Sequence, residues 1–441
     1  MIYRKIYKDL LDWKNKKSRK PLILKWARQV WKSFIVKEFW KKEFNNFFEL
    51  NFQENKELKE IFEKNLDPEK ILLKIEIIFW KKIDKKNDLI FFDEIQEAPR
   101  ALTSLKYFCE KMPELAIIWA WSYLGLLKEN ESFPVWKVEF LSMFPITFEE
   151  FLQVKNKDLF EIYKKIDVKN PQEIDNFFHK KFLELLNKYF LIWWMPEVVQ
   201  KYLELWELNL ENFTKIRKLQ KSILESYERD FIKYSGLLNT WNILELYEKI
   251  PYQLQTEYDE SVNRFKFSWI LSWKRSFNDF VWYLTFLSKS RLIIKNYIIE
   301  IPKKPLKAYI KNNIFKVFYH DIWLLNARLW VSLNDFINKN LWEYKGFIAE
   351  NFVAQELFAK FDEGLISWKS RNSEIEFLVE NNDLIIPIEV KSSQKYRRAK
   401  SLNVYIEKYN PKIAYKITME NFYKTEKFIN LPMYLISREL F

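Results

Sequence analysis

The sequence predicts an α/β protein in which a parallel β-sheet, with helices between its strands, occupies the N-terminal part. Apolar runs of strand length alternate with helix-compatible segments over residues 21–151. A Lys32-Ser33 pair follows the first of these runs, and Asp93-Glu94 ends a later one. Polar pairs in such positions mark the ligand-binding edge of a parallel sheet. A similar alternation near the C-terminus predicts a second α/β domain.

The first strand leads into a loop with the layout of a phosphate-binding site. Pro21–Lys25 is the strand, and the next eight residues have the spacing G-x-x-x-x-G-K-[S/T], with tryptophan at both glycine positions. In such a loop Lys32 reaches the β- and γ-phosphates of ATP, and Ser33 binds Mg²⁺. The candidate ATP-binding residues are therefore Trp26, Ala27, Arg28, Gln29, Val30, Trp31, Lys32 and Ser33.

The tryptophan content of the chain offers an explanation for this departure from the pattern. The 441 residues include 19 Trp and 4 Gly, whereas ordinary glycine usage would give roughly 31. Some bacterial lineages read the codon UGA as glycine, whereas common alternative translation tables read it as tryptophan. We therefore interpret many tryptophans, including Trp26 and Trp31, as glycines of the native protein. Because the loop backbone must approach phosphate closely, true tryptophans would abolish the site.

A second diagnostic strand carries two carboxylates at its carboxyl end. Leu89–Phe92 is an apolar run that Asp93 and Glu94 follow. Asp93 would hold Mg²⁺, and Glu94 would polarise the water that attacks the γ-phosphate, which makes Glu94 the candidate catalytic residue. An ordinary strand end with acidic residues is the alternative, but the phosphate loop earlier in the chain favours the functional interpretation.

The remaining N-terminal segments complete the sheet. Phe47–Phe52 alternates like a strand, Glu57–Phe79 reads as a charged helical segment, and Arg100–Lys111 reads as a helix. A buried strand at Leu115–Ile118 leads to Ser122, which is a candidate contact of the γ-phosphate or the attacking water. A turn hydroxyl is the equal alternative for Ser122. The last elements expected in this part are a strand at Val135–Leu141 and a closing segment at Phe144–Phe151.

Composition excludes several other classes of protein. A single Cys109 rules out a disulfide framework, and His179 and His320 alone make no histidine metal cluster. The absence of a signal segment and of a run of about 18 apolar residues predicts a cytoplasmic protein with no membrane partner. The net charge of +13 is compatible with nucleic acid. It is weak support, because the basic residues are mostly lysines in a chain rich in Ile, Asn and Phe.

Several of these stretches together resemble a known family. The phosphate loop, Phe92–Glu97 and Phe144–Phe151 resemble the AAA-type ATPases of bacteria and archaea that carry a C-terminal domain of unknown function. That family writes the loop as Gly-x-Arg-Gln-x-Gly-Lys-[Ser/Thr]. The resemblance implies a P-loop NTPase domain that binds ATP and Mg²⁺. It extends over nearly the whole chain, through Trp193–Val199, Phe315–Leu325 and Gly346–Leu357.

The middle of the chain is mostly helical by its pattern. Phe265–Leu292 followed by a β-wing at Ile293–Pro302 looks like a winged-helix unit. Units of this type bind DNA grooves or pack against other domains. DNA is therefore a candidate partner that the sequence alone does not establish.

The C-terminal third contains carboxylates and a lysine that resemble the PD-(D/E)xK nuclease core. Glu376 lies on one predicted strand, Glu389 and Lys391 end the next, and Glu350 lies on a helix-like segment. In that core the acids hold Mg²⁺, and the lysine orients the attacking water or supports the phosphate charge. Alternation places Glu389 and Lys391 on one strand face. Because the pattern prefers Asp where this chain has Glu376, a degenerate site is the alternative.

The predicted organisation has three domains. They are an AAA-type P-loop ATPase domain (1–155), a helical winged-helix-like domain (156–312) and a restriction-endonuclease-like α/β domain (313–441). The predicted function is a Mg²⁺-dependent ATPase coupled to a nuclease-like, DNA-binding domain. A nuclease with a nucleotide-sensing P-loop domain and a non-catalytic interaction protein with degenerate sites are the alternatives, and each is compatible with an oligomer.

Overall fold

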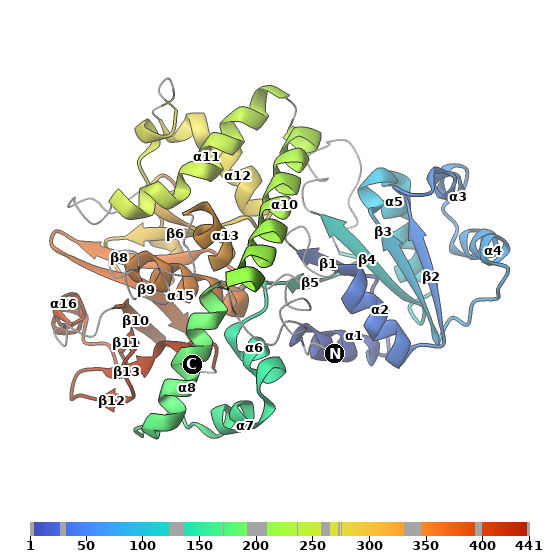
Figure 1. The fold of residues 1–441 in the computed structure, drawn as a ribbon. Coiled ribbons are helices and arrows are strands. Elements are labelled where there is room, and N and C mark those ends of the chain that lie inside the picture. Colours follow the sequence, from blue (N-terminus) through green and yellow to red (C-terminus); the bar gives the residue numbers. More distant parts are fainter. Residues whose placement is uncertain are drawn as a thin grey trace. The chain divides into compact units, whose positions relative to one another are not determined.

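Two β-sheets organise the chain in the computed structural model (Figure 1). The structure describes residues 4–26, 32–122, 136–170, 172–191, 210–235, 237–256, 265–271, 274, 276–329, 345–392 and 399–438. The chain divides into two units, Met1–Phe144 and Pro145–Phe441. None of the described helices is both long enough and apolar enough to cross a membrane.

The sheet of the first unit is entirely parallel, as the sequence predicted. Its strand order is β2-β3-β4-β1-β5, so β1 lies inside the sheet between β4 and β5. The strands are β1 (Leu22–Trp26), β2 (Asn46–Asn51), β3 (Asp88–Asp93), β4 (Ala116–Ser122) and β5 (Glu139–Met143).

Helices connect these strands and cover the sheet. They are α1 (Ile6–Lys14), α2 (Lys32–Glu43), α3 (Glu60–Glu63), α4 (Pro68–Phe79) and α5 (Pro99–Lys111), with the 3-10 helices η1 (Lys56–Lys59) and η2 (Ile95–Glu97). The single helical segment predicted over 57–79 is wrong, because the structure divides it into η1, α3 and α4. The break spans residues 64–67 and ends at Pro68, which lacks an N–H to continue a helix but suits the first position of a new one.

The second unit contains an eight-stranded mixed sheet in the order β12-β13-β11-β10-β9-β8-β6-β7. Parallel pairs join β10 to β11, β11 to β13 and β6 to β8, and the other neighbours are antiparallel. The strands are β6 (Ile293–Ile299), β7 (Phe315–Tyr319), β8 (Leu365–Ser370), β9 (Ser373–Asn381), β10 (Leu384–Val390), β11 (Tyr415–Thr418), β12 (Tyr423–Lys424) and β13 (Ile429–Pro432).

Strand β6 differs from the wing that the sequence predicted for this segment. It lies between β7 and β8 in the eight-stranded sheet and is buried along most of its length. An apolar strand buried on both faces needs neighbours on its two edges, which a solvent-exposed wing does not supply. The segment is therefore part of the C-terminal sheet, and the winged-helix interpretation stays a prediction without support from β6.

Helices fill most of the described chain between residues 148 and 289. They are α6 (Phe148–Lys155), α7 (Lys157–Lys165), α8 (Asn176–Leu191), α10 (Leu210–Ser235), α11 (Leu237–Thr256) and α12 (Phe277–Lys289). Three more follow within the sheet-forming region: α13 (Ile322–Arg328), α15 (Lys345–Phe361) and α16 (Lys400–Tyr409). Thr147 begins α6 with a capping box, since its side chain accepts the Glu150 N–H and the Glu150 carboxylate accepts the Thr147 N–H.

Helix α15 supplies buried polar side chains that satisfy backbone groups of other elements. Gln355 Oε1 accepts the N–H of Ile322 at 2.9 Å, at the start of α13. Glu356 Oε1 accepts the N–H of Phe148 at 3.0 Å, at the start of α6, and its Oε2 accepts the Ser437 hydroxyl at 2.7 Å. These bonds fix the orientation of α15, which also carries Glu350.

Candidate functional site

The loop predicted to bind phosphate connects β1 to α2. β1 ends at Trp26 and α2 begins at Lys32, so the loop leaves the carboxyl end of an internal parallel strand and enters a helix N-terminus. A helix N-terminus offers free N–H groups and a positive dipole end to an anion. Residues outside the described part of the chain are Ala27, Arg28, Gln29, Val30 and Trp31, together with the side chains of Trp26, Lys32, Ser33 and Ser122.

The predicted carboxylate pair lies at the same edge of the sheet as this loop. The parallel register pairs Trp26 with Ser122, and Phe92 with Trp119, so the strands β1, β3 and β4 end side by side. Asp93 is the last residue of β3 and is almost completely buried. The motifs that the sequence singled out are thereby brought to one edge of the first unit.

Glu94 has a backbone conformation that is uncommon for a residue with a side chain. Its φ and ψ are 53° and 42°, in the left-handed region, and its N–H donates to Asp93 Oδ1 at 3.0 Å. Backbone strain of this kind costs on the order of 1–3 kcal/mol and is concentrated at functional sites. The turn directs the chain from β3 into η2 and holds the Glu94 side chain, which is partly exposed, just beyond the strand end.

The three predicted residues of the C-terminal site also come together. The antiparallel register pairs Ile388 with Phe377, which makes Glu389 and Glu376 neighbours on β10 and β9. Lys391 Nζ lies 2.8 Å from Glu376 Oε1 and 3.8 Å from Glu389 Oε1. Glu376 Oε2 accepts the Val390 N–H at 3.1 Å. The prediction of a carboxylate pair with an adjacent lysine therefore matches the geometry.

Two buried lysines that the sequence analysis did not single out complete this cluster. Lys316 on β7 is 3% exposed and lies 2.6 Å from Glu374 and 3.6 Å from Glu350. Lys416 on β11 is 1% exposed and pairs in register with Glu389. The sequence feature that could have indicated both residues is a lysine within an otherwise apolar strand segment. Its partners could not be found in the sequence, because the strands that supply them lie far apart along the chain.

Burial and neighbouring charges alter the ionisation of this cluster. Burial raises the pKa of Glu389 to about 7, and the Glu376 carboxylate adds to the increase. For Lys391, burial acts to lower the pKa, but the attraction of Glu376 and Glu389 outweighs it and raises the pKa above its usual value. Lys391 is therefore held as a cation and is not available as a neutral base.

In the predicted Mg²⁺ site of the C-terminal unit, lysine side chains of the chain lie beside the expected ligands. Within the described ranges, no group of three or more Asp, Glu, His or Cys side chains is arranged to hold a metal ion. Glu350, the third expected ligand, lies beside Lys316. Both oxygens of Glu376 already accept hydrogen bonds, from Lys391 and Val390. The metal roles predicted for Glu350, Glu376 and Glu389 therefore gain no support.

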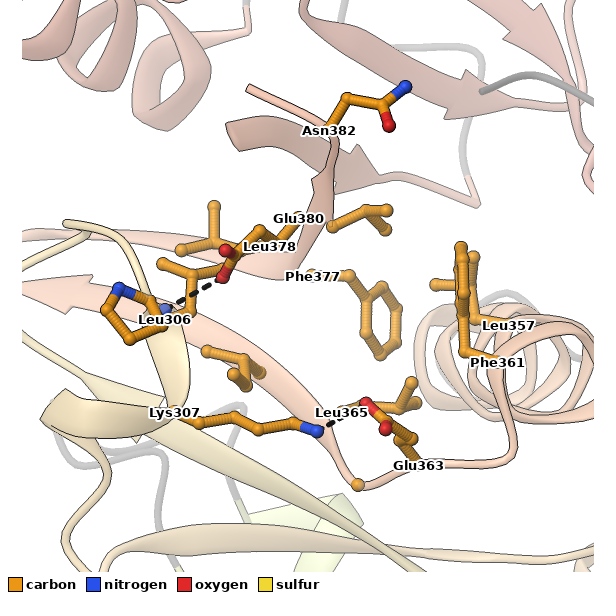
Figure 2. Close-up of a pocket in the computed structure, with 14 residues that line it drawn as sticks. Leu306, Lys307, Leu357, Phe361, Glu363, Leu365, Phe377, Leu378, Glu380 and Asn382 are labelled. Atoms are coloured by element: carbon orange, nitrogen blue, oxygen red, sulfur yellow. Dashed lines mark hydrogen bonds and ion pairs between the residues drawn. The ribbon is translucent and has the colours of Figure 1, made fainter. Parts of the chain in front are cut away.

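A cavity of about 530 Å³ lies elsewhere in the second unit (Figure 2). Apolar side chains from α15 and β9 line it, among them Leu357, Phe361 and Phe377. At its edge Lys307 Nζ lies 2.6 Å from Glu363, as Figure 2 shows. The lining includes none of the predicted site residues, so the cavity contributes to neither candidate site.

One tryptophan occupies a position that favours glycine. Trp80 follows α4 with φ 52° and ψ 37°, and Lys81 N–H donates to the Glu76 carbonyl at 3.1 Å to close the helix end. This is the helix C-terminal position where glycine predominates, because only glycine adopts the left-handed region without strain. The Trp80 side chain is 92% exposed. An exposed indole at a left-handed helix end is consistent with a glycine in the native protein.

Two other tryptophans have the environment expected of the native residue. Trp13 and Trp368 are buried, and their indole N–H groups donate to the Lys20 carbonyl at 2.8 Å and the Glu300 carbonyl at 3.1 Å. Buried tryptophans ordinarily make such a bond. Trp368 also stacks edge-on against Tyr405.

Comparisons with known proteins identify a family for part of each unit. Residues 18–152 match the family described as an AAA domain, and residues 345–435 match a domain of unknown function (DUF4143). No curated protein matches the chain significantly. The first match and the all-parallel sheet support a P-loop ATPase fold for the N-terminal part, as the sequence predicted.

Two solved structures show weak likeness to the chain. The Walker-type ATPase paby2304 of Pyrococcus abyssi is 15% identical with a TM-score of 0.43, and the match covers 75% of this chain and 96% of that one. The RuvB Holliday junction branch migration motor of Thermotoga maritima is 13% identical with a TM-score of 0.28, over 68% and 90% of the two chains.

Proposed function

We propose that the N-terminal unit binds ATP with Mg²⁺ and hydrolyses it. The observation that carries this proposal is the meeting of two motifs at one sheet edge. The β1–α2 loop leaves that edge, and Asp93 and Glu94 end β3 there. The AAA-domain match covers both motifs.

Each residue of this site has a distinct chemical role in the proposal. Lys32 neutralises the β- and γ-phosphates, while Ser33 and Asp93 hold Mg²⁺. Glu94 orients the attacking water, and Ser122 contacts that water or the γ-phosphate. The strained backbone of Glu94 supports its role, since a structural strand end needs no carboxylate in the left-handed region.

The proposed loop requires glycine at positions 26 and 31. An indole ring at either position would fill the space in which the backbone N–H groups meet the phosphates. The left-handed Trp80 supports the same decoding at a position far from the loop in sequence. The proposed enzyme is therefore the protein with glycine at these positions.

The proposed ATP site lies in the first unit, and the second unit has no assigned step in ATP hydrolysis. Coupling of ATP hydrolysis to a nuclease or to DNA remains a prediction from the sequence resemblance. That prediction rests on the carboxylate–lysine cluster of β9 and β10, in which Lys391 Nζ lies 2.8 Å from Glu376 Oε1.

The test separates binding from chemistry in the protein with Trp26→Gly and Trp31→Gly. Lys32→Ala removes a charge that contacts nucleotide before and during the reaction, so it should weaken ATP binding itself. Glu94→Gln should leave binding nearly intact and lower single-turnover hydrolysis by a factor on the order of 10²–10⁴. Equilibrium binding and single-turnover rates measured on the same samples distinguish the two effects.

A matched control for Glu94 is Glu97, a carboxylate three residues further along that lies 3.8 Å from Lys59. Glu97→Gln should hydrolyse ATP at the parent rate. If Glu94→Gln also does so, the carboxylate pair is an ordinary strand end, and the proposed catalytic residue is lost.

A further inference from the structure

The cluster around Glu376 and Glu389 places two buried carboxylates beside a lysine of the chain. Glu376 and Glu389 are adjacent on neighbouring strands and are 6% and 1% exposed. Two buried carboxylates side by side repel each other unless a cation lies between them. The structure supplies that cation from the chain itself, as the Lys391 ammonium group.

Three of the four oxygen atoms of the two carboxylates lie near N–H groups of the chain. Glu376 Oε1 accepts from Lys391 Nζ at 2.8 Å, and Glu376 Oε2 accepts from the Val390 N–H at 3.1 Å. Glu389 Oε1 lies 3.8 Å from Lys391 Nζ. Glu389 Oε2 is buried and has no hydrogen-bond partner among the described residues. A metal ion would have to displace Lys391 to reach ligands on both strands.

The charges around the pair are already close to balance without a metal. The cluster contains four carboxylates (Glu350, Glu374, Glu376 and Glu389) and three ammonium groups (Lys316, Lys391 and Lys416). With every group ionised, one negative charge is in excess.

We propose that the Lys391 ammonium occupies the position between Glu376 and Glu389 that a divalent cation would need, so that the C-terminal unit takes up no metal there. Lys391 is then the resident cation of the cluster. The proposal concerns the second unit alone and does not depend on ATP binding by the first.

The test is a calorimetric titration of the nucleotide-free full chain with MnCl₂. Lys391→Met keeps an unbranched side chain one atom shorter than lysine and removes the charge, which should open a Mn²⁺ site that the parent lacks. Adding Glu389→Gln to Lys391→Met should abolish the new site and assign it to this cluster. Lys412→Met, at an exposed lysine of the same unit, should bind no more Mn²⁺ than the parent.

If Lys391→Met does not fold, Mn²⁺ titration of the parent protein and of Glu389→Gln still tests the proposal. A Mn²⁺ site in the parent that Glu389→Gln removes would overturn the proposal, because the cluster would then hold metal with Lys391 in place. A folded Lys391→Met protein, as shown by its thermal unfolding, that gains no Mn²⁺ site would overturn it too. Absence of a Glu389-dependent site in the parent and its appearance in Lys391→Met support it.

Discussion

Replacing Glu94 with glycine should stabilise the first unit while removing its activity. Glu94 has φ 53°, and an L-residue in the left-handed region is strained by about 1–2 kcal/mol. Glycine relieves that strain but gains about 0.4–1 kcal/mol of chain entropy in the unfolded state. The expected net gain in the free energy of unfolding is about 0.5–1 kcal/mol.

Trp80 provides a matched control in the same unit. Its φ of 52° is nearly that of Glu94, but it lies at the end of α4 with an exposed side chain. Trp80→Gly should therefore raise stability by a similar amount, about 0.5–1 kcal/mol. Trp136→Gly is the negative control, because Trp136 is also highly exposed but has no positive φ. It should leave stability unchanged or slightly lower.

The assay combines urea unfolding with single-turnover ATP hydrolysis, with glycine at positions 26 and 31 in every variant. Glu94→Gly should unfold at higher urea concentration and lose hydrolysis, whereas Trp80→Gly should do the first without the second. If Glu94→Gly is destabilised, the strain argument fails. If it hydrolyses ATP at the parent rate, the assignment of Glu94 fails.

Three further predictions follow from single residues. The codon UGA should encode Trp26, Trp31, Trp80, Trp119, Trp121, Trp193, Trp194 and Trp323, and UGG should encode the hydrogen-bonded Trp13 and Trp368. Sequencing the gene checks this, and UGG at positions 26 and 31 would contradict the decoding hypothesis. Burial raises the pKa of Asp321 from 3.8 to about 7, so the folded state retains this proton and becomes less stable as pH rises between those values. Asp321→Asn keeps an acceptor for the Trp323 N–H and should reduce the change in the free energy of unfolding between pH 5 and pH 7.5, measured by urea unfolding. Glu356→Ala should lower the free energy of unfolding by about 2–4 kcal/mol, because the Phe148 N–H and the Ser437 hydroxyl lose their acceptor. Glu356→Gln keeps an acceptor oxygen and should have a smaller effect. Equal effects of the two variants would show that these hydrogen bonds contribute little.

The sequence was most informative where one short segment determines the structure. The apolar run before Asp93 and Glu94 specifies a buried strand with two acids at its end, and the structure has that strand as β3. The spacing from Pro21 to Ser33 predicted a strand, a loop and a helix, and β1 and α2 follow it. Such features depend on local periodicity, which a single sequence contains.

Features that depend on distant partners could not be predicted in the same way. The sequence predicted a wing for strand β6, whereas the structure pairs β6 with β8. That pairing joins residues about 70 positions apart, so the local pattern does not show it. Lys316 on β7 meets Glu374 on β9 only through the folded sheet. The backbone of Glu94 was also unpredictable, since its left-handed conformation opposes the local preference of glutamate. Tertiary structure decided each of these cases.

We infer that the β1–α2 loop is an ATP site with glycine at positions 26 and 31 of the native protein. Calorimetric titration of Mg²⁺-ATP into two versions of the full chain tests it most directly, one with tryptophan at positions 26 and 31 and one with Trp26→Gly and Trp31→Gly. The account predicts no binding to the first version, and binding to the second that Lys32→Ala removes. Equal affinity of the two versions, or no binding by either, would contradict the claim.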